Sequence, residues 1–220
     1  MSIDASRHRS VFNPGEWGNR RIDVIGVGAT GSKVALALAR LGVRNLHVWD
    51  GDTVEAHNIA NQVYDQADVG RPKVEAFAET MDRATGSRPT THGFWQGEKP
   101  LGEVVFCLPD SMRVRREVYE ALRASTSTRL VIETRMGASH GQVLTYRPGD
   151  PENLRRYEAS LFDDDDAQVE TSACGTAITV GPTGDALVGF AVWQFLRYAA
   201  GKEVSPGLAI GVEEPQLVLL

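Results

Sequence analysis

The chain has 220 residues and a formal net charge of −6 at pH 7. That length can bury the core of one α/β domain, so we expect a single domain over residues 1–220, and the negative charge argues against binding to nucleic acid, which requires a basic surface. The two cysteines, Cys107 and Cys174, are too few for a disulfide framework, and the longest apolar stretch, residues 186–193, is too short to cross a bilayer, so we expect a reduced cytoplasmic protein without a membrane segment.

Residues 1–20 combine basic and polar side chains with a few apolar ones. Arg7 and Arg9 lie close in sequence to Phe12 and Trp17. Apolar side chains in an otherwise polar segment favour an N-terminal arm that packs against a surface. A solvated basic arm is the alternative.

A glycine-rich turn follows the first predicted strand, Arg21–Ile25. Gly26 permits a tight turn, Gly28 lets the backbone approach a pyrophosphate, and Gly31 lets the next helix pack closely on the strand. That helix, predicted over residues 33–43, presents the unpaired N–H groups of its first turn to an anion. The pattern predicts a nucleotide site, although a glycine turn without any ligand has the same spacing.

A second strand is predicted at Asn45–Trp49, and Asp50 follows it directly. This acid lies about 20 residues beyond the glycine turn, where a carboxylate can accept hydrogen bonds from ribose hydroxyls. A short helix or turn is expected at residues 54–62, and a helix at 72–81 that carries Lys73 in its first turn. Acids, amides and a lysine thus stand where a dehydrogenase has an ordinary crossover helix.

The middle of the chain alternates between strand and helix patterns. Strands are predicted at residues 90–95, 103–108 and 130–133, a helix at 111–124, and a strand at 141–147 whose alternating pattern indicates an antiparallel or edge position. Asp110 comes directly before the helix, and the first turns of the helix carry Arg113, Arg115 and Arg116. The sequence therefore places a basic cluster beside Asp110.

The C-terminal part begins with a polar stretch. Residues 152–173 are expected to form a loop that includes the acidic run Asp163–Asp166. A helix is predicted at 185–200, followed by two short apolar strands. Together, the elements predict an α/β protein with a mixed sheet.

The order of these motifs resembles the adenylating family of ThiF, MoeB and the ubiquitin-activating enzymes. In that family an acid pair after the second strand leads to an Asn-x-x-Arg-Gln motif and then to a Gly-x-x-Lys motif. The matching residues here are Asp50, Asp52, Asn58, Asn61, Gln62, Gly70 and Lys73. The resemblance implies a homodimer with a Rossmann-like three-layer α/β fold, whose mainly parallel sheet is extended by antiparallel strands, and it makes residues 152–173 a crossover-type loop.

The family's reaction joins a carboxylate to the α-phosphate of ATP and releases pyrophosphate, while Mg²⁺ and cationic side chains neutralise the triphosphate. By resemblance, Lys73 is the phosphate cation, and Asp110 is the carboxylate that binds Mg²⁺ or lies beside the α-phosphate. Asp50 and Asp52 face the ribose and the purine. The other positions expected around ATP are Gly26, Gly28, Gly31, Asn58, Asn61 and Gln62, of which Asn58 and Gln62 fix phosphate and metal-bound water.

Asn61 departs from the family pattern, because the Asn-x-x-Arg-Gln motif has arginine at this position. Two residues are candidates to replace the lost charge. One is Arg9, since an N-terminal arginine reaches into the partner subunit's site in the family, and the other is Arg115. The alternative is a protein that binds the nucleotide without turning it over rapidly.

The resemblance implies that the activated carboxylate is the C-terminus of a small ubiquitin-like or sulfur-carrier protein. Cys174 matches a cysteine that takes the acyl group in some family members, and a buried structural cysteine is the alternative. Two other functions stay open. Asn61 favours a noncatalytic nucleotide-binding dimerisation module, and the glycine turn alone favours an NAD-dependent oxidoreductase.

Overall fold

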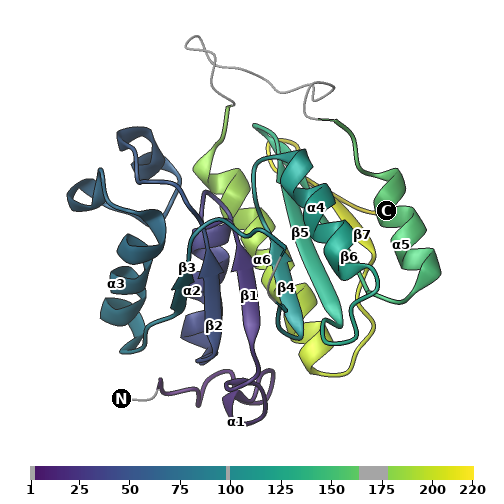
Figure 1. Ribbon diagram of the computed structural model, residues 1–220, viewed down its shortest axis with the longest axis horizontal. Helices are drawn as coiled ribbons and strands as arrows, with labels where there is room; N and C mark the ends of the chain where they lie inside the picture. The colour runs from purple at the N-terminus through teal and green to yellow at the C-terminus, as the bar shows by residue number, and fades with distance from the viewer. Residues whose placement is uncertain (1–2, 98–99, 164–177) are drawn as a thin grey trace.

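The computed structural model describes residues 3–97, 100–163 and 178–220 (Figure 1). Within these residues, eight strands form one sheet in the order β3-β2-β1-β4-β5-β6-β7-β8. The strands are β1 (Ile22–Ile25), β2 (Leu46–Trp49), β3 (Thr90–His92), β4 (Val104–Cys107), β5 (Leu130–Met136), β6 (His140–Tyr146), β7 (Gly207–Gly211) and β8 (Gln216–Leu219).

Five neighbouring strands, from β3 to β5 in the spatial order, are parallel. β1 and β4 lie at the centre of this half, and every residue of both strands is buried. Nearly continuous apolar strands suit a sheet that is covered on both faces. The five strands end at the upper edge of the sheet in Figure 1, which we call the carboxyl edge. Ligands of open α/β sheets bind at this edge.

The other half of the sheet is antiparallel. β5 pairs with β6, with Thr134 opposite Val143, and β7 and β8 continue the antiparallel pairing beyond β6. The strand predicted at 141–147 is therefore antiparallel, and it lies inside the sheet. The predicted α/β fold, a mainly parallel sheet extended by antiparallel strands, is confirmed.

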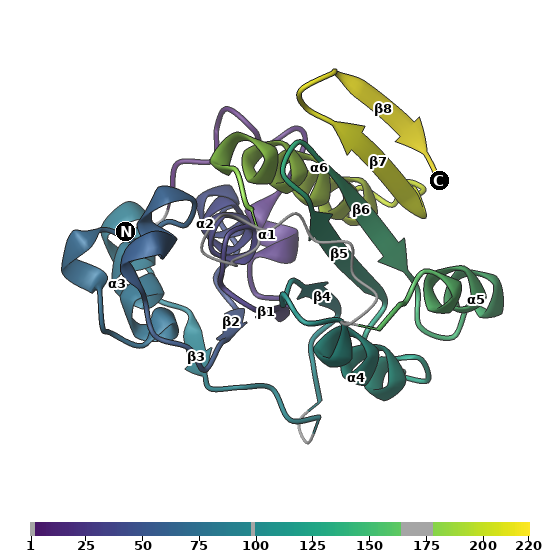
Figure 2. The ribbon, with the colours of Figure 1, turned by 90° about the horizontal axis from the view of Figure 1, so that it is seen from above.

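Helices form a layer on each face of the sheet. α2 and α6 pack side by side on one face, α3 lies next to α2, and α4 and α5 cover the other face (Figure 2). The helices are α1 (Pro14–Trp17), α2 (Gly31–Leu41), α3 (Lys73–Thr85), α4 (Met112–Leu122), α5 (Pro151–Ala159) and α6 (Gly181–Ala199), with the short 3₁₀ helices η1 (Ala56–Ala60) and η2 (Gln66–Asp68). Among the residues described, no helix is both long enough and apolar enough to cross a membrane.

The N-terminal segment packs on its own chain. Phe12 is buried, and its ring centroid lies 5.5 Å from that of Phe195 on α6, while the ring centroid of Trp17 lies 5.3 Å from the same ring. His8 Nε2 lies 3.2 Å from the carbonyl oxygen of Leu41, the last residue of α2. Because α2 begins at the carboxyl edge, this contact places the segment at the opposite edge of the sheet (Figure 1).

The polar stretch predicted as a loop at residues 152–173 begins with a helix instead, since α5 covers Pro151–Ala159. Asp150 caps this helix by accepting two N–H groups of its first turn. Tyr157 anchors it, because its buried ring lies 4.3 Å from the ring of Tyr146 between centroids. One buried aromatic side chain is too weak a periodic pattern to predict a helix. The rest of this stretch, residues 164–173, lies outside the described residues.

Candidate functional site

The glycine turn between β1 and α2 lies at the carboxyl edge. Gly26 has φ = 86°, and a Cβ at this position would lie 2.7 Å from the carbonyl oxygen of Leu108. A Cβ at residue 31 would overlap the carbonyl oxygen of Gly26, so the helix can approach only with glycine there. A Cβ at residue 28, in contrast, would meet no atom of the described residues within 4 Å. The turn is therefore closed by packing on two sides and open at Gly28.

Asp50 holds this turn in place from the end of β2. Its Oδ2 accepts the N–H of Val27 at 2.9 Å, and its Oδ1 accepts the N–H of Asp52 at 2.9 Å. The hydroxyl of Tyr64 donates to the carbonyl of Val27 at 2.8 Å. Burial raises the pKa of the Asp50 carboxyl, while the charge of Lys73 acts in the opposite direction. Each carboxylate oxygen can accept one further bond, so Asp50 can bind a ribose hydroxyl without releasing the turn.

Lys73 and Asp52 form an ion pair at the same edge. The Nζ of Lys73 lies 2.9 Å from Oδ2 of Asp52, and the Lys73 N–H donates to the Asp52 carbonyl at 2.9 Å. Lys73 is the first residue of α3 and is buried along its stem, whereas the carboxylate of Asp52 is 54% exposed. The structure thus brings together three predicted residues, Asp50, Asp52 and Lys73, beside the glycine turn.

The amides of the Asn-x-x-Arg-Gln-like motif lie on and after η1. Asn58 is buried and its Oδ1 accepts the N–H of Glu55, so its amide stabilises the 3₁₀ turn. The Nδ2 of Asn61 donates to Oγ1 of Thr179. Two buried oxygens, Oδ1 of Asn61 and Oε1 of Gln62, have no hydrogen-bond partner among the residues that the structure describes. They are acceptors, so they suit an ammonium group or a metal-bound water rather than a phosphate oxygen.

Asp110 is exposed in the turn between β4 and α4. The residues just before it pack on the glycine turn, since Pro109 N and Leu108 O are among the atoms nearest to a Cβ placed on Gly26. The described residues contain no cluster of three His, Cys, Asp or Glu side chains that could hold a metal ion. A single exposed carboxylate still suits Mg²⁺, which is usually bound by one or two carboxylates together with substrate phosphates and water. Asp110 is the residue that would hold it.

Arg115 points away from this site, contrary to its predicted role as a replacement cation. Its side chain is buried, its Nη1 lies 2.9 Å from Oε1 of the fully buried Glu133, and its Nη2 donates to the carbonyl of Pro109. The reason is its position on the sheet-facing side of α4, together with Met112 and Tyr119. Arg115 therefore fixes the turn before Asp110 and is not free to bind phosphate.

Two predicted catalytic residues remain, Arg9 and Cys174. Arg9 is exposed in the N-terminal segment, and its neighbour His8 contacts Leu41 at the end of α2 that is far from the glycine turn. Cys174 lies outside the described residues. Cys107 is buried in β4, and burial raises the pKa of its thiol well above the ordinary value, as expected for a core cysteine.

Lys33 is a polar residue of this edge that the sequence patterns did not single out. It lies in the first turn of α2, with its Nζ 2.7 Å from Oδ1 of Asp185 and 3.4 Å from the carbonyl oxygen of Gly181. The signal in the sequence is its position two residues after Gly31, on the helix whose N-terminus faces the predicted anion.

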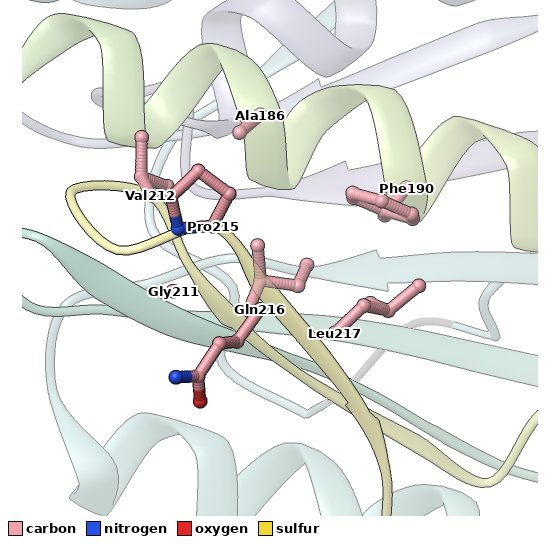
Figure 3. A pocket seen from close by; sticks show the side chains of 8 residues that line it. Ala186, Phe190, Gly211, Val212, Pro215, Gln216 and Leu217 are labelled. Carbon is pink, nitrogen blue, oxygen red and sulfur yellow. The ribbon is translucent and has the colours of Figure 1, made fainter.

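An apolar hollow of about 430 Å³ lies apart from these residues, between α6 and the β7–β8 hairpin (Figure 3). The side chains of Phe190, Val212 and Leu217 are among those that line it. It contains none of the predicted site residues, so the candidate site is defined by the carboxyl edge.

Residues 14–91 match the model of the ThiF family. The likeness to the ThiF family covers this part of the chain. It contains the glycine turn, the acid pair, the amide motif and Lys73, whereas Asp110, Arg115 and Cys174 lie beyond it.

Similar curated proteins include the adenylyltransferase and sulfurtransferase MOCS3-1 of Zea mays, which is 39% identical over 88 residues, or 37% of this chain and 19% of that protein. The NEDD8-activating enzyme E1 catalytic subunit of Caenorhabditis elegans is 32% identical over 105 residues, or 44% of this chain and 24% of that one. The molybdopterin-synthase adenylyltransferase of Escherichia coli is 38% identical over 64 residues, or 29% and 26%. The aligned part is thus about a fifth to a quarter of the length of these relatives.

Solved structures extend the likeness of fold over nearly the whole chain. Escherichia coli MccB with AMPCPP and MccA has a TM-score of 0.75 and 15% identity, covering 97% of this chain and 68% of MccB. MccB with ATP has a TM-score of 0.73 and 16% identity, covering 94% and 64%. PaaA has a TM-score of 0.72 and 19% identity, covering 98% and 68%. At these identities the likeness establishes a common fold.

Proposed function

We propose that this chain is an ATP-dependent adenylyltransferase that activates a carboxylate as an acyl adenylate. The observation that carries the proposal is the ion pair of Lys73 and Asp52 beside a glycine turn that Asp50 holds open at Gly28. A dehydrogenase has no need of a lysine at this place, whereas a triphosphate needs cations. The names of the relatives, adenylyltransferase and activating enzyme, support the same reaction.

In this reaction a carboxylate oxygen attacks the α-phosphorus of ATP, the bond from that phosphorus to the pyrophosphate oxygen breaks, and pyrophosphate leaves. The first turn of α2 presents N–H groups to the phosphates, and Lys73 exchanges the carboxylate of Asp52 for phosphate oxygens. Asp50 accepts a hydrogen bond from a ribose hydroxyl. Mg²⁺, held by Asp110, would neutralise charge that develops on the leaving pyrophosphate. Positioning and electrostatic stabilisation carry the rate, since no covalent enzyme group is required.

The substrate that we propose is the C-terminal carboxylate of a small protein or peptide, of the ubiquitin-like or sulfur-carrier kind. The support is indirect: one relative is named as a NEDD8-activating enzyme, and MccB structures include MccA. A nucleotide-binding module without turnover is the second candidate, and the uncharged Asn61 favours it.

Pyrophosphate exchange into ATP, measured with candidate carrier C-termini, tests the proposal. Exchange that depends on the carrier and on Mg²⁺ is the expected result. ATP with Mg²⁺ should also raise the melting temperature, because a ligand that binds the native state stabilises it. ATP binding without exchange would favour the noncatalytic module, and a rise with NAD alone would contradict adenylation.

We further propose that the protein acts as a homodimer in which Arg9 completes the partner's site. Arg9 follows His8, which contacts the end of α2 far from the glycine turn of the same chain, and this position supports an action on another chain. An equal mixture of Arg9→Ala and Lys73→Ala chains should regain about a quarter of wild-type exchange, because half of the dimers are mixed and each has one intact site. Activity no greater than that of the separate variants would contradict a shared site.

A further inference from the structure

Lys33 occupies a defined place between the first turn of α2 and the start of α6. Its Nζ lies 2.7 Å from the carboxylate of Asp185 and 3.4 Å from the carbonyl oxygen of Gly181. The Lys33 side chain is 18% exposed, whereas that of Asp185 is 64% exposed. The ammonium group is therefore held by a carboxylate that water can solvate when the pair separates.

Asn61 contacts the segment just before the start of α6. Its amide donates to Thr179, two residues before the carbonyl that Lys33 contacts, and the Oγ of Ser32 receives the N–H of Val63 at 3.4 Å. A Cβ on Gly181 would lie 3.6 Å from the carbonyl oxygen of Ala60. The first turn of α2, the segment after η1 and the start of α6 thus converge beside the glycine turn.

Lys33 and Asn61 differ in charge. Asn61 is neutral, and its Oδ1, unpaired within the described part of the chain, is an acceptor. Arg115 is buried against Glu133, and Lys73 lies on α3 with Asp52 as its partner. Lys33 is the cation that the first turn of α2 itself supplies. Its flexible four-carbon stem lets a point charge move between a carboxylate and a phosphate.

We propose that Lys33 is a second phosphate-binding cation, which supplies from α2 the charge that position 61 lacks. Asp185 holds its ammonium group until the triphosphate displaces the carboxylate. The Oδ1 of Asn61 can then accept a hydrogen bond from the ammonium group of Lys33. This inference rests on the proposed binding of ATP. It adds Lys33 to the ATP site, although Lys33 lies outside the motifs that predicted this site.

The test compares four single variants for ATP affinity by calorimetry and for pyrophosphate exchange. Lys33→Ala should weaken ATP binding by roughly 10-fold to 100-fold, the effect of losing a charge-assisted hydrogen bond. Lys33→Arg should stay within a few-fold of wild type. Arg40→Ala is the matched control, since it removes a positive charge from an exposed position two turns along the same helix and should change neither quantity.

Asp185→Asn separates a binding role from a structural one. It breaks the same ion pair as Lys33→Ala, so a purely structural pair predicts the same loss in both variants. Our proposal predicts that Asp185→Asn binds ATP at least as tightly as wild type, because the ammonium group is released to the phosphates. Equal losses in the two variants would overturn the proposal.

Asn61→Arg in the Lys33→Ala background should restore most of the lost affinity, since the two side chains approach the same place. No recovery would overturn the assignment of Lys33 to the charge missing at position 61. A wild-type protein that binds no ATP would overturn the proposed function and this inference together. Wild-type binding that Lys33→Ala leaves unchanged would overturn this inference alone.

Discussion

Two sets of ion pairs in this protein differ in what surrounds their carboxylates. At the carboxyl edge, Lys73 pairs with Asp52 and Lys33 pairs with Asp185, and the two carboxylates are 54% and 64% exposed. Under α4 and α5, Arg115 and Arg135 both pair with Glu133, whose side chain is fully buried.

The exposure of the carboxylate decides whether a cation can change partner. A solvated carboxylate that is displaced returns to water, so a lysine at the edge can exchange it for a phosphate at little cost. A buried carboxylate that loses its partner becomes an uncompensated charge in a medium of low dielectric constant. The edge pairs are therefore suited to binding, and the buried cluster is suited to holding structure.

The largest effect is expected from breaking the buried cluster. Arg115→Ala should lower the free energy of unfolding by about 3–5 kcal/mol, because it leaves Glu133 partly unpaired in the core. Urea denaturation measures this change.

A double variant tests whether the loss comes from the unpaired charge. Arg115→Met combined with Glu133→Gln removes both charges of this pair, while Arg135 keeps its bonds to Ser160, and it should cost less than the sum of the two single changes. A loss of stability in the double variant equal to the sum of the two single losses would show that packing, rather than charge, dominates at this place.

The next effect concerns activity. Lys73→Met keeps the buried stem of the side chain and removes only the ammonium group, so exchange should fall roughly 100-fold to 1,000-fold, the loss typical of one electrostatic donor in an active site. The free energy of unfolding should change by less than about 1 kcal/mol, since Asp52 is solvated.

Lys202→Met is the matched control for that variant. Lys202 is exposed after the end of α6, and the same chemical change there should leave exchange and stability as in wild type. Wild-type exchange in folded Lys73→Met protein would remove Lys73 from the reaction.

The sequence predicted the parallel half of the molecule well for physical reasons. The three glycines, the buried strands and the acid at the end of β2 are local signals, because each depends on residues close by in the chain. The structure confirms that Gly26 and Gly31 are required by packing, and it places Asp50, Asp52 and Lys73 together. Whether these residues bind ATP stays a prediction.

Other features depend on contacts between distant segments, which a local pattern cannot show. Arg115 looks like a basic residue of an exposed helix until Glu133 of β5 is placed beneath it. Lys33 gains its place from Asp185, far along the chain, and α5 gains its anchor from Tyr146 in a neighbouring strand. These are the residues for which the sequence-based interpretation was incomplete or wrong.

A smaller effect is expected from Asp50→Asn. The amide retains one acceptor oxygen, so it can keep one of the bonds to Val27 and Asp52 and must lose the other. The free energy of unfolding should change by less than about 1 kcal/mol. Burial disfavours the charged form of Asp50 and so raises its pKa, and a neutral amide avoids this cost, which offsets the lost bond.

ATP affinity of Asp50→Asn, measured by calorimetry, should fall by roughly 5-fold to 10-fold, since a ribose hydroxyl loses a charged acceptor and the glycine turn is less firmly held. Unchanged affinity would place the ribose elsewhere.

The smallest effect is expected at a partly exposed pair that has no proposed ligand. Arg71 donates to both oxygens of Glu79, at 2.6 Å and 3.0 Å, and these bonds lower the pKa of the Glu79 carboxyl below its ordinary value. A lowered pKa in the folded state means that the pair stabilises the fold above the unfolded pKa and that this contribution is lost as the pH falls through the folded pKa.

Wild type should therefore melt slightly above Glu79→Gln at neutral pH, and the difference should disappear between about pH 4.5 and pH 3, as glutamate is protonated. Thermal unfolding of both proteins across this range measures it. ATP affinity should be the same in both, because Arg71 keeps Asp68 as a partner at 3.1 Å and approaches no phosphate in our proposal. A difference in melting temperature that persisted at pH 3 would show that Glu79 acts through packing and not through its charge.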